Sequence, residues 1–158
     1  MVLWTLACTA GWGVGAPLTI AALPEGDAVV RGLGGLAGGA LLSALLQLPL
    51  VRGGGVRGAS WIGAALAAAV LAVLVVLVAG RLDRDMAWVV AAGLFGTSLA
   101  LLQARAAGTR GGAVWVWVLV GTLGWSVAAP VGGFAGWIAL GAVYGAITAP
   151  ALGKIVPR

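Results

Sequence analysis

The sequence lacks most of the side chains that enzymes use. It contains no histidine, one cysteine (Cys8) and four acidic residues, and only 8% of its 158 residues are charged. A single cysteine provides neither an internal disulfide nor a cysteine-based metal site. Catalysis within a membrane needs a nucleophile with a base, paired carboxylates or a metal ion. The serine and threonine hydroxyls have no evident activating partner, so we expect no enzymatic activity, no cofactor and no metal.

Polar stretches that could cover a water-facing surface are also missing. Hydrophobic residues make up 62% of the chain and the mean hydropathy is +1.13, whereas a soluble domain is about 45–50% apolar and about 25% charged. In lipid, backbone polar groups must be paired internally, which leaves helices or closed barrels. Barrel strands alternate apolar and polar residues, but here the apolar runs are continuous. The composition therefore predicts an all-α integral membrane protein.

Six segments approach the roughly 20 helical residues needed to cross a hydrocarbon core about 30 Å thick. Pro17 is expected to kink the first segment or end it early, and Pro130 to end the fifth. The first segment has no basic n-region, so we expect it to remain as a helix rather than be cleaved as a signal peptide. The six segments, which together form a single transmembrane domain, are 2–23, 28–51, 60–80, 86–104, 113–129 and 134–152.

The few charged residues lie between these segments or, for Arg31, near the start of one, and they predict an orientation. One side of the membrane would carry six basic residues and no acid, and the other three basic and four acidic residues. Because Lys- and Arg-rich short loops stay in the cytoplasm, both termini are expected there, in a cell membrane such as the bacterial inner membrane. The net charge of +5 is spread too thinly for a nucleic-acid site. The residues that set the orientation are Arg52, Arg57, Arg105, Arg110 and Lys154, with Arg158 at the C-terminus.

A repeated spacing indicates an internal repeat. Trp61 follows Gln47 by 14 residues, Trp117 follows Gln103 by the same interval, and these are the only glutamines in the chain. Trp4 and Trp12 match Trp117 and Trp125 at an offset of 113. We predict three helical hairpins, at about 1–57, 58–112 and 113–158, related as parallel repeats about an axis along the membrane normal.

Small residues four apart mark the second helix of each predicted hairpin. This spacing places them on one helix face, where the absence of bulk lets two backbones approach closely. We expect these helices to lie inside the bundle and the tryptophan-led helices outside. Trp4, Trp61 and Trp117 would then belong to interfacial belts, with Trp12 and Trp125 packed deeper over glycine gaps. The packing positions are Gly35, Gly39, Gly96, Gly141 and Gly145.

The combined pattern resembles a group of uncharacterised bacterial multi-pass membrane proteins built from Trp- and Gly-rich helical hairpins. The matching features are the W-x(7)-W pair that ends in Gly-Trp, the G-x(3)-G ladder that leads to a glutamine, and the arginine loop before the next tryptophan. The resemblance implies the hairpin architecture and implies no activity. The positions that carry it are Trp4, Gly11, Trp12, Gln47, Arg52, Trp61, Gln103, Trp117, Gly124 and Trp125.

Gln47 and Gln103, with Ser43 one turn before Gln47, are the candidate polar positions. They would either form interhelical hydrogen bonds, worth roughly 0.6–2 kcal/mol, or line a cytoplasmic vestibule that takes a polar headgroup. We expect a small protein that acts by helix association, as a scaffold, assembly factor or membrane subunit. The alternative is a transporter, channel or lipid-handling protein with a mostly apolar cavity between hairpins. Expected partners are membrane lipids and other membrane proteins or further copies of the chain.

Overall fold

The computed structural model describes residues 1–25, 28–78, 84–128 and 133–156, and in these ranges the chain is all-helical with no strand. The six predicted segments each form a helix whose ends fall within a few residues of the expected positions. The helices are α1 (Val2–Ala21), α2 (Ala28–Arg52), α3 (Gly58–Val78), α4 (Arg84–Ala106), α5 (Gly112–Ala128) and α6 (Gly133–Ile155).

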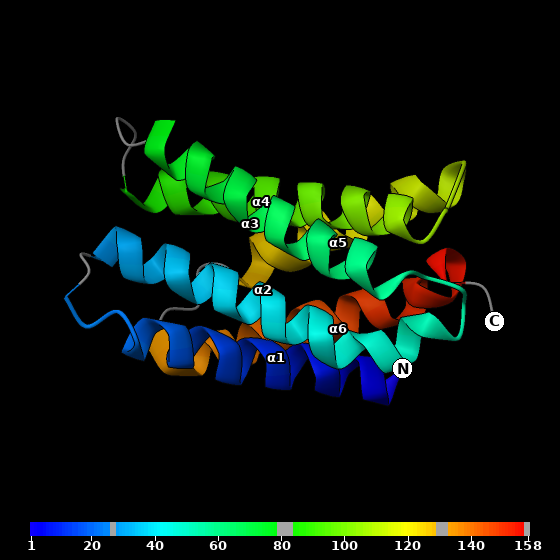
Figure 1. Cartoon of the computed structure of the whole chain (residues 1–158). Helices are drawn as coiled ribbons and strands as arrows, with labels where there is room; N and C mark the ends of the chain where they lie inside the picture. The colour runs from blue at the N-terminus through cyan, green and yellow to red at the C-terminus, as the bar shows by residue number, and fades with distance from the viewer. Residues whose placement is uncertain (26–27, 79–83, 129–132, 157–158) are drawn as a thin grey trace.

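Glycines make the short turns possible at the end of the bundle that holds both termini (Figure 1). Gly55 (φ +79°) and Gly108 (φ +68°) adopt the left-handed conformation that side chains disfavour. Gly108 ends α4 with a bond from the Thr109 N–H to the Ala104 carbonyl (2.9 Å), as in a Schellman motif. Thr109 Oγ1 also donates to the Ile155 carbonyl (2.9 Å), which joins this turn to the end of α6.

Prolines do not end the helices that contain them. Pro17, Pro49 and Pro150 lie inside α1, α2 and α6, so the early end considered for the first helix at Pro17 does not occur. Membrane-type helices tolerate proline where neighbouring groups pair the freed backbone carbonyl. Pro130, expected to end the fifth helix, lies outside the described residues.

Each helix packs on its neighbours along the chain, and α6 packs on α1, so that the six helices form a closed ring. Figure 1 shows the helices running back and forth, with the α2–α3 and α4–α5 turns at the same end as both termini. Among the described residues, α2, α4 and α6 form no extensive contact with one another. The expectation that these three helices form the interior is therefore wrong.

Tryptophans fill the centre of the ring instead. Trp4, Trp61 and Trp117, from α1, α3 and α5, are at most 1% exposed, and the Trp4 ring lies 6.2 Å and 5.9 Å from the other two. Burial of a whole indole stabilises the core, with about 0.5–1.5 kcal/mol more per well-placed aromatic pair. These three residues are core residues rather than members of a lipid-facing belt, which corrects the expectation from the sequence.

A second aromatic layer, formed by Trp12, Phe95 and Trp125, lies further from the chain termini along the bundle. The Trp125 ring is 4.6 Å from Trp12 and 4.4 Å from Phe95, both in edge-to-face arrangements. Trp12 covers Gly39, whose missing side chain leaves the room that the indole occupies. Trp12 of α1 therefore packs over a glycine of α2, and Trp125 of α5 packs over Gly96 of α4 in the same manner.

The small-residue positions bring backbones together within the chain. A Cβ on Gly141 would lie 2.5 Å from the Cys8 carbonyl oxygen, and one on Gly145 would lie 2.8 Å from the Thr5 Cα. On Gly96 it would lie 2.7 Å from the Gly121 carbonyl oxygen, and on Gly35 2.8 Å from the Ile20 side chain. The ladders of α2 and α6 therefore pack on α1, and that of α4 packs on α5.

Three described helices are long and apolar enough to cross a membrane: Val30–Arg52, Gly58–Val75 and Gly136–Ile155. Shorter apolar helices cover Val90–Ala106 and Gly112–Val127. Large apolar side chains on the outer surface, such as Leu18 (64% exposed) and Leu119 (61%), are suited to lipid contact. Six spans, three repeats and cytoplasmic termini remain predictions.

Candidate functional site

The most polar part of the described core is centred on Gln47, near the end of α2. Its amide is 2% exposed and bonds to three other side chains. Nε2 lies 3.0 Å from Ser43 Oγ and 3.2 Å from Cys8 Sγ, and Oε1 accepts the indole N–H of Trp61 at 3.0 Å. Gln47 thus joins α2 to α1 and to α3 through hydrogen bonds, the first of the two alternatives given for this residue from the sequence.

A second tryptophan is held in the same way by a different residue. Trp4 Nε1 donates to Thr148 Oγ1 at 2.8 Å, and the Thr148 hydroxyl donates to the Tyr144 carbonyl one turn earlier at 2.7 Å. Thr148 is fully buried. The hydroxyl therefore acts as donor and acceptor at once, and α6 is fixed to α1 as α2 is to α3.

Gln103 and Trp117 share the sequence spacing of Gln47 and Trp61 but do not share their hydrogen bond. Gln103 Oε1 and Trp117 Nε1 are both buried without a hydrogen-bond partner, as are Trp125 Nε1 and the Tyr144 hydroxyl. Buried polar atoms usually have partners, because an unpaired one costs about 1–3 kcal/mol. The buried polar groups of Gln103 and Trp117 are therefore less well hydrogen-bonded than those of Gln47 and Trp61.

A cavity of about 10 Å³ separates the two glutamines. Gln47, Gln103, Ser43 and Tyr144 contribute its polar lining, with Trp12 among the apolar residues that enclose it. The two glutamines therefore line one space, but the space holds no more than a molecule the size of water.

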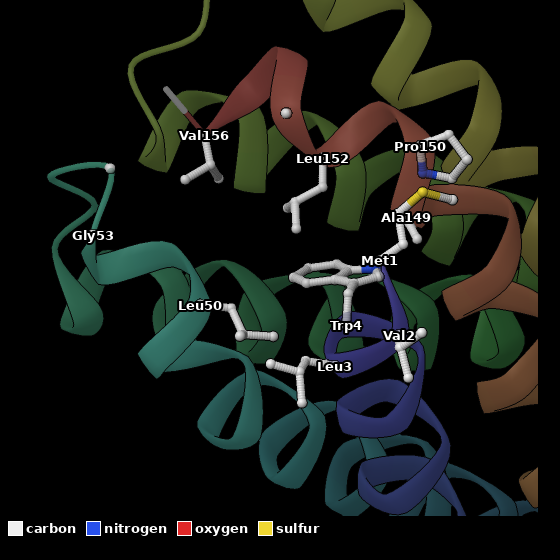
Figure 2. A pocket seen from close by; sticks show the side chains of 12 residues that line it. Met1, Val2, Leu3, Trp4, Leu50, Gly53, Ala149, Pro150, Leu152 and Val156 are labelled. Carbon is white, nitrogen blue, oxygen red and sulfur yellow. The ribbon is translucent and has the colours of Figure 1, made fainter. Parts of the chain in front are cut away.

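A much larger cavity of about 790 Å³ opens at the end of the bundle that holds the termini, and we call it the end groove. Figure 2 shows the Trp4 ring within it, with Leu3 and Leu50 on one side and Leu152 on the other. Its lining consists of apolar side chains and glycine, and the glutamines do not belong to it.

The remaining predicted positions lie away from the polar core. The basic residues predicted to set the orientation are exposed near the ends of α2, α4 and α6 or in the turns after α2 and α4: Arg52, Arg57, Arg105, Arg110 and Lys154. In the part of the chain that the structure describes, no group of three or more His, Cys, Asp or Glu residues lies close enough to hold a metal ion.

Thr148 and Tyr144 were not recognised from the sequence as members of this site. One signal for Thr148 was present, because it precedes Pro150 by two residues as Gln47 precedes Pro49. Tyr144 is the only tyrosine in the chain, but neither its spacing nor its neighbours indicate that it lines a cavity together with both glutamines.

Comparison with protein-family models, with curated proteins and with solved structures found no match. The resemblance to Trp- and Gly-rich hairpin proteins thus remains a prediction.

Proposed function

We propose that the chain is a small, non-enzymatic integral membrane protein that acts by helix association, as a scaffold, an assembly factor or a membrane subunit. One observation carries this proposal: side chains fill the centre of the six-helix ring. Two aromatic layers occupy it, and the space between Gln47 and Gln103 is about 10 Å³. Ion- or proton-coupled transport usually depends on ionisable groups deep in the membrane. Arg31 is exposed near the start of α2, and we place it at the membrane interface rather than deep in the membrane.

The alternative is a transporter, channel or lipid-handling protein with a cavity that runs from the glutamines toward the middle of the membrane. The closed glycine contacts at Gly96, Gly141 and Gly145 argue against such a path, and so does the position of the end groove, which the glutamines do not line. The observations therefore favour association over transport.

An association surface must lie on the outside of the ring, because the glycine ladders are already used within the chain. The outer face of α3 offers small residues at the required spacing: Ala59, Gly63 and Ala67 are four apart and all exposed. A Cβ on Gly63 would meet no atom within 4 Å. This face accepts close approach by another membrane helix.

The test combines flux and partner retention. The purified chain in liposomes is expected to give no flux above empty liposomes for a panel of ions, small solutes and fluorescent lipids. Cross-linking in native membranes should capture a partner or a second copy, and Gly63→Leu should reduce that capture. Gly112→Leu is the matched control, since Gly112 is also exposed and has open space around it. Flux that Gln103→Leu abolishes would overturn the proposal in favour of transport.

A further inference from the structure

The end groove has the chemistry of an acyl-chain site. Its volume, about 790 Å³, falls within the roughly 300–1,000 Å³ of small-molecule pockets. The Trp4 indole N–H, the main polar group of its lining side chains, is already bonded to Thr148. The lining side chains therefore leave no donor or acceptor free for a polar ligand, and a hydrocarbon chain needs none.

Two basic residues adjoin the groove lining in the sequence. Arg52 directly precedes Gly53 and Lys154 directly follows Gly153, and both glycines line the groove. Both basic side chains are exposed, and the Arg52 guanidinium lies close to Gly58 at the start of α3. Glu25 follows the end of α1 and Asp85 belongs to the start of α4, and these two helix ends lie at the opposite end of the bundle from the groove (Figure 1). Basic clusters beside a membrane surface attract anionic lipid.

We propose that the end groove holds one acyl chain of an anionic phospholipid, with the phosphate beside Arg52 and Lys154. The lipid covers Met1, Val2 and Leu3, which are 75%, 71% and 66% exposed at the start of α1. It also bridges the ends of α1, α2 and α6. This binding is independent of the proposed function, because the lipid is a bound component of the chain and not a transported substrate.

The test is native mass spectrometry of the full chain after exchange into an equimolar mixture of phosphatidylglycerol and phosphatidylcholine. One phosphatidylglycerol should remain per chain. Gly153→Trp and, separately, Gly53→Trp should remove it, because a Cβ at either position meets no atom within 4 Å and the indole has room to enter the groove. Gly63→Trp on the outer face of α3 is the matched control and should retain the lipid.

The headgroup contribution is tested by Arg52→Gln with Lys154→Gln. Loss of two charges should lower the preference for phosphatidylglycerol over phosphatidylcholine by roughly thirtyfold at low ionic strength, with one lipid still bound. Three results would each overturn the proposal. The first is that the parent chain retains no lipid, and the second is that both groove variants retain as much lipid as the parent chain while matching its helicity and melting temperature. The third is a lipid-free dimer that the groove variants dissociate. The last result would assign the groove to a second copy.

A second inference rests on the small cavity and on two unpaired atoms that belong to residues lining it. Gln103 Oε1 and the Tyr144 hydroxyl are buried without partners, and both residues face a space of about 10 Å³ shared with Ser43 and Gln47. A polar cavity of roughly 10–15 Å³ is enough for one water molecule with two to four partners. We infer that one water molecule is bound here, donating to Gln103 Oε1 and accepting from the Tyr144 hydroxyl.

The change in melting temperature caused by Tyr144→Phe tests whether water is bound at this site. Tyr144→Phe removes only the hydroxyl, so it should lower the melting temperature if the hydroxyl bonds to water. Gln103→Leu should also lower it, and the double variant should fall by less than the sum, because both atoms bind the same molecule. A rise or no change on Tyr144→Phe, or strict additivity, would show that the two atoms are independent and would overturn the inference.

Discussion

Trp61 donates its indole N–H to Gln47 Oε1 across 3.0 Å, and the two residues are 14 positions apart in the chain. Gln103 and Trp117 have the same separation, yet the corresponding oxygen and nitrogen are buried without a partner. Trp4 bonds to Thr148 in place of a glutamine. Two of the three central tryptophans are therefore held by hydrogen bonds to different residue types and the third by none, so loss of the acceptor is expected to have unequal effects at the three positions.

Gln47→Leu is expected to destabilise the chain by about 1–3 kcal/mol, because it leaves the buried Trp61 N–H unpaired. It also removes the bonds to Ser43 and Cys8. The measurement is the free energy of unfolding in a denaturing detergent titration. Gln103→Leu is the matched control and should cost less than half as much, since Gln103 Oε1 accepts no protein donor. Equal losses would contradict the asymmetry.

The fold was largely predictable because its signals are local. Continuous apolar runs locate six helices within a few residues of their ends. The arrangement of these helices was not predictable, because the same tryptophans fit a lipid interface or a core equally well by composition. Indoles at positions such as Trp4 and Trp61 are buried only because the rings of different helices meet at the centre, and no local pattern encodes that meeting.

The candidate site was predicted in part. Gln47, Ser43 and Trp61 were singled out by spacing, and the structure brings them together. Thr148 was passed over, because a membrane-embedded threonine ordinarily bonds to its own helix. It does so here, to the Tyr144 carbonyl, and accepts from Trp4 as well. That second bond spans 144 positions of sequence, a separation that spacing rules do not address.

Thr148→Val should destabilise the chain by about 1–3 kcal/mol, because the shape is kept while the acceptor for the Trp4 N–H is lost. Thr148→Ser keeps the hydroxyl and should recover most of that loss. Thermal melting in detergent followed by near-ultraviolet circular dichroism reports on the central tryptophans directly. If the valine and serine variants melt together, the Trp4–Thr148 bond contributes nothing to stability.

Gly141→Ala should destabilise the chain by about 1–3 kcal/mol, the usual range for overpacking. The added Cβ would lie 2.5 Å from the Cys8 carbonyl oxygen and 2.8 Å from the Thr9 Cα, and backbone atoms have little freedom to move aside. Gly63→Ala is the control: its Cβ meets nothing within 4 Å, so the better helix propensity of alanine should leave stability unchanged or higher by up to about 1 kcal/mol. The opposite order would contradict the close packing of α6 on α1.

The orientation is testable with single cysteines because the native one is shielded. Cys8 is 0% exposed and accepts a hydrogen bond from Gln47, so it should react slowly with maleimides in the folded chain. Gly112→Cys and Glu25→Cys place exposed thiols at opposite ends of the bundle (Figure 1). In spheroplasts, a membrane-impermeant maleimide should label Glu25→Cys at once and Gly112→Cys only after permeabilisation, since Lys- and Arg-rich loops remain cytoplasmic. Labelling in the reverse order would invert the orientation, and immediate labelling of both would contradict a membrane-spanning bundle.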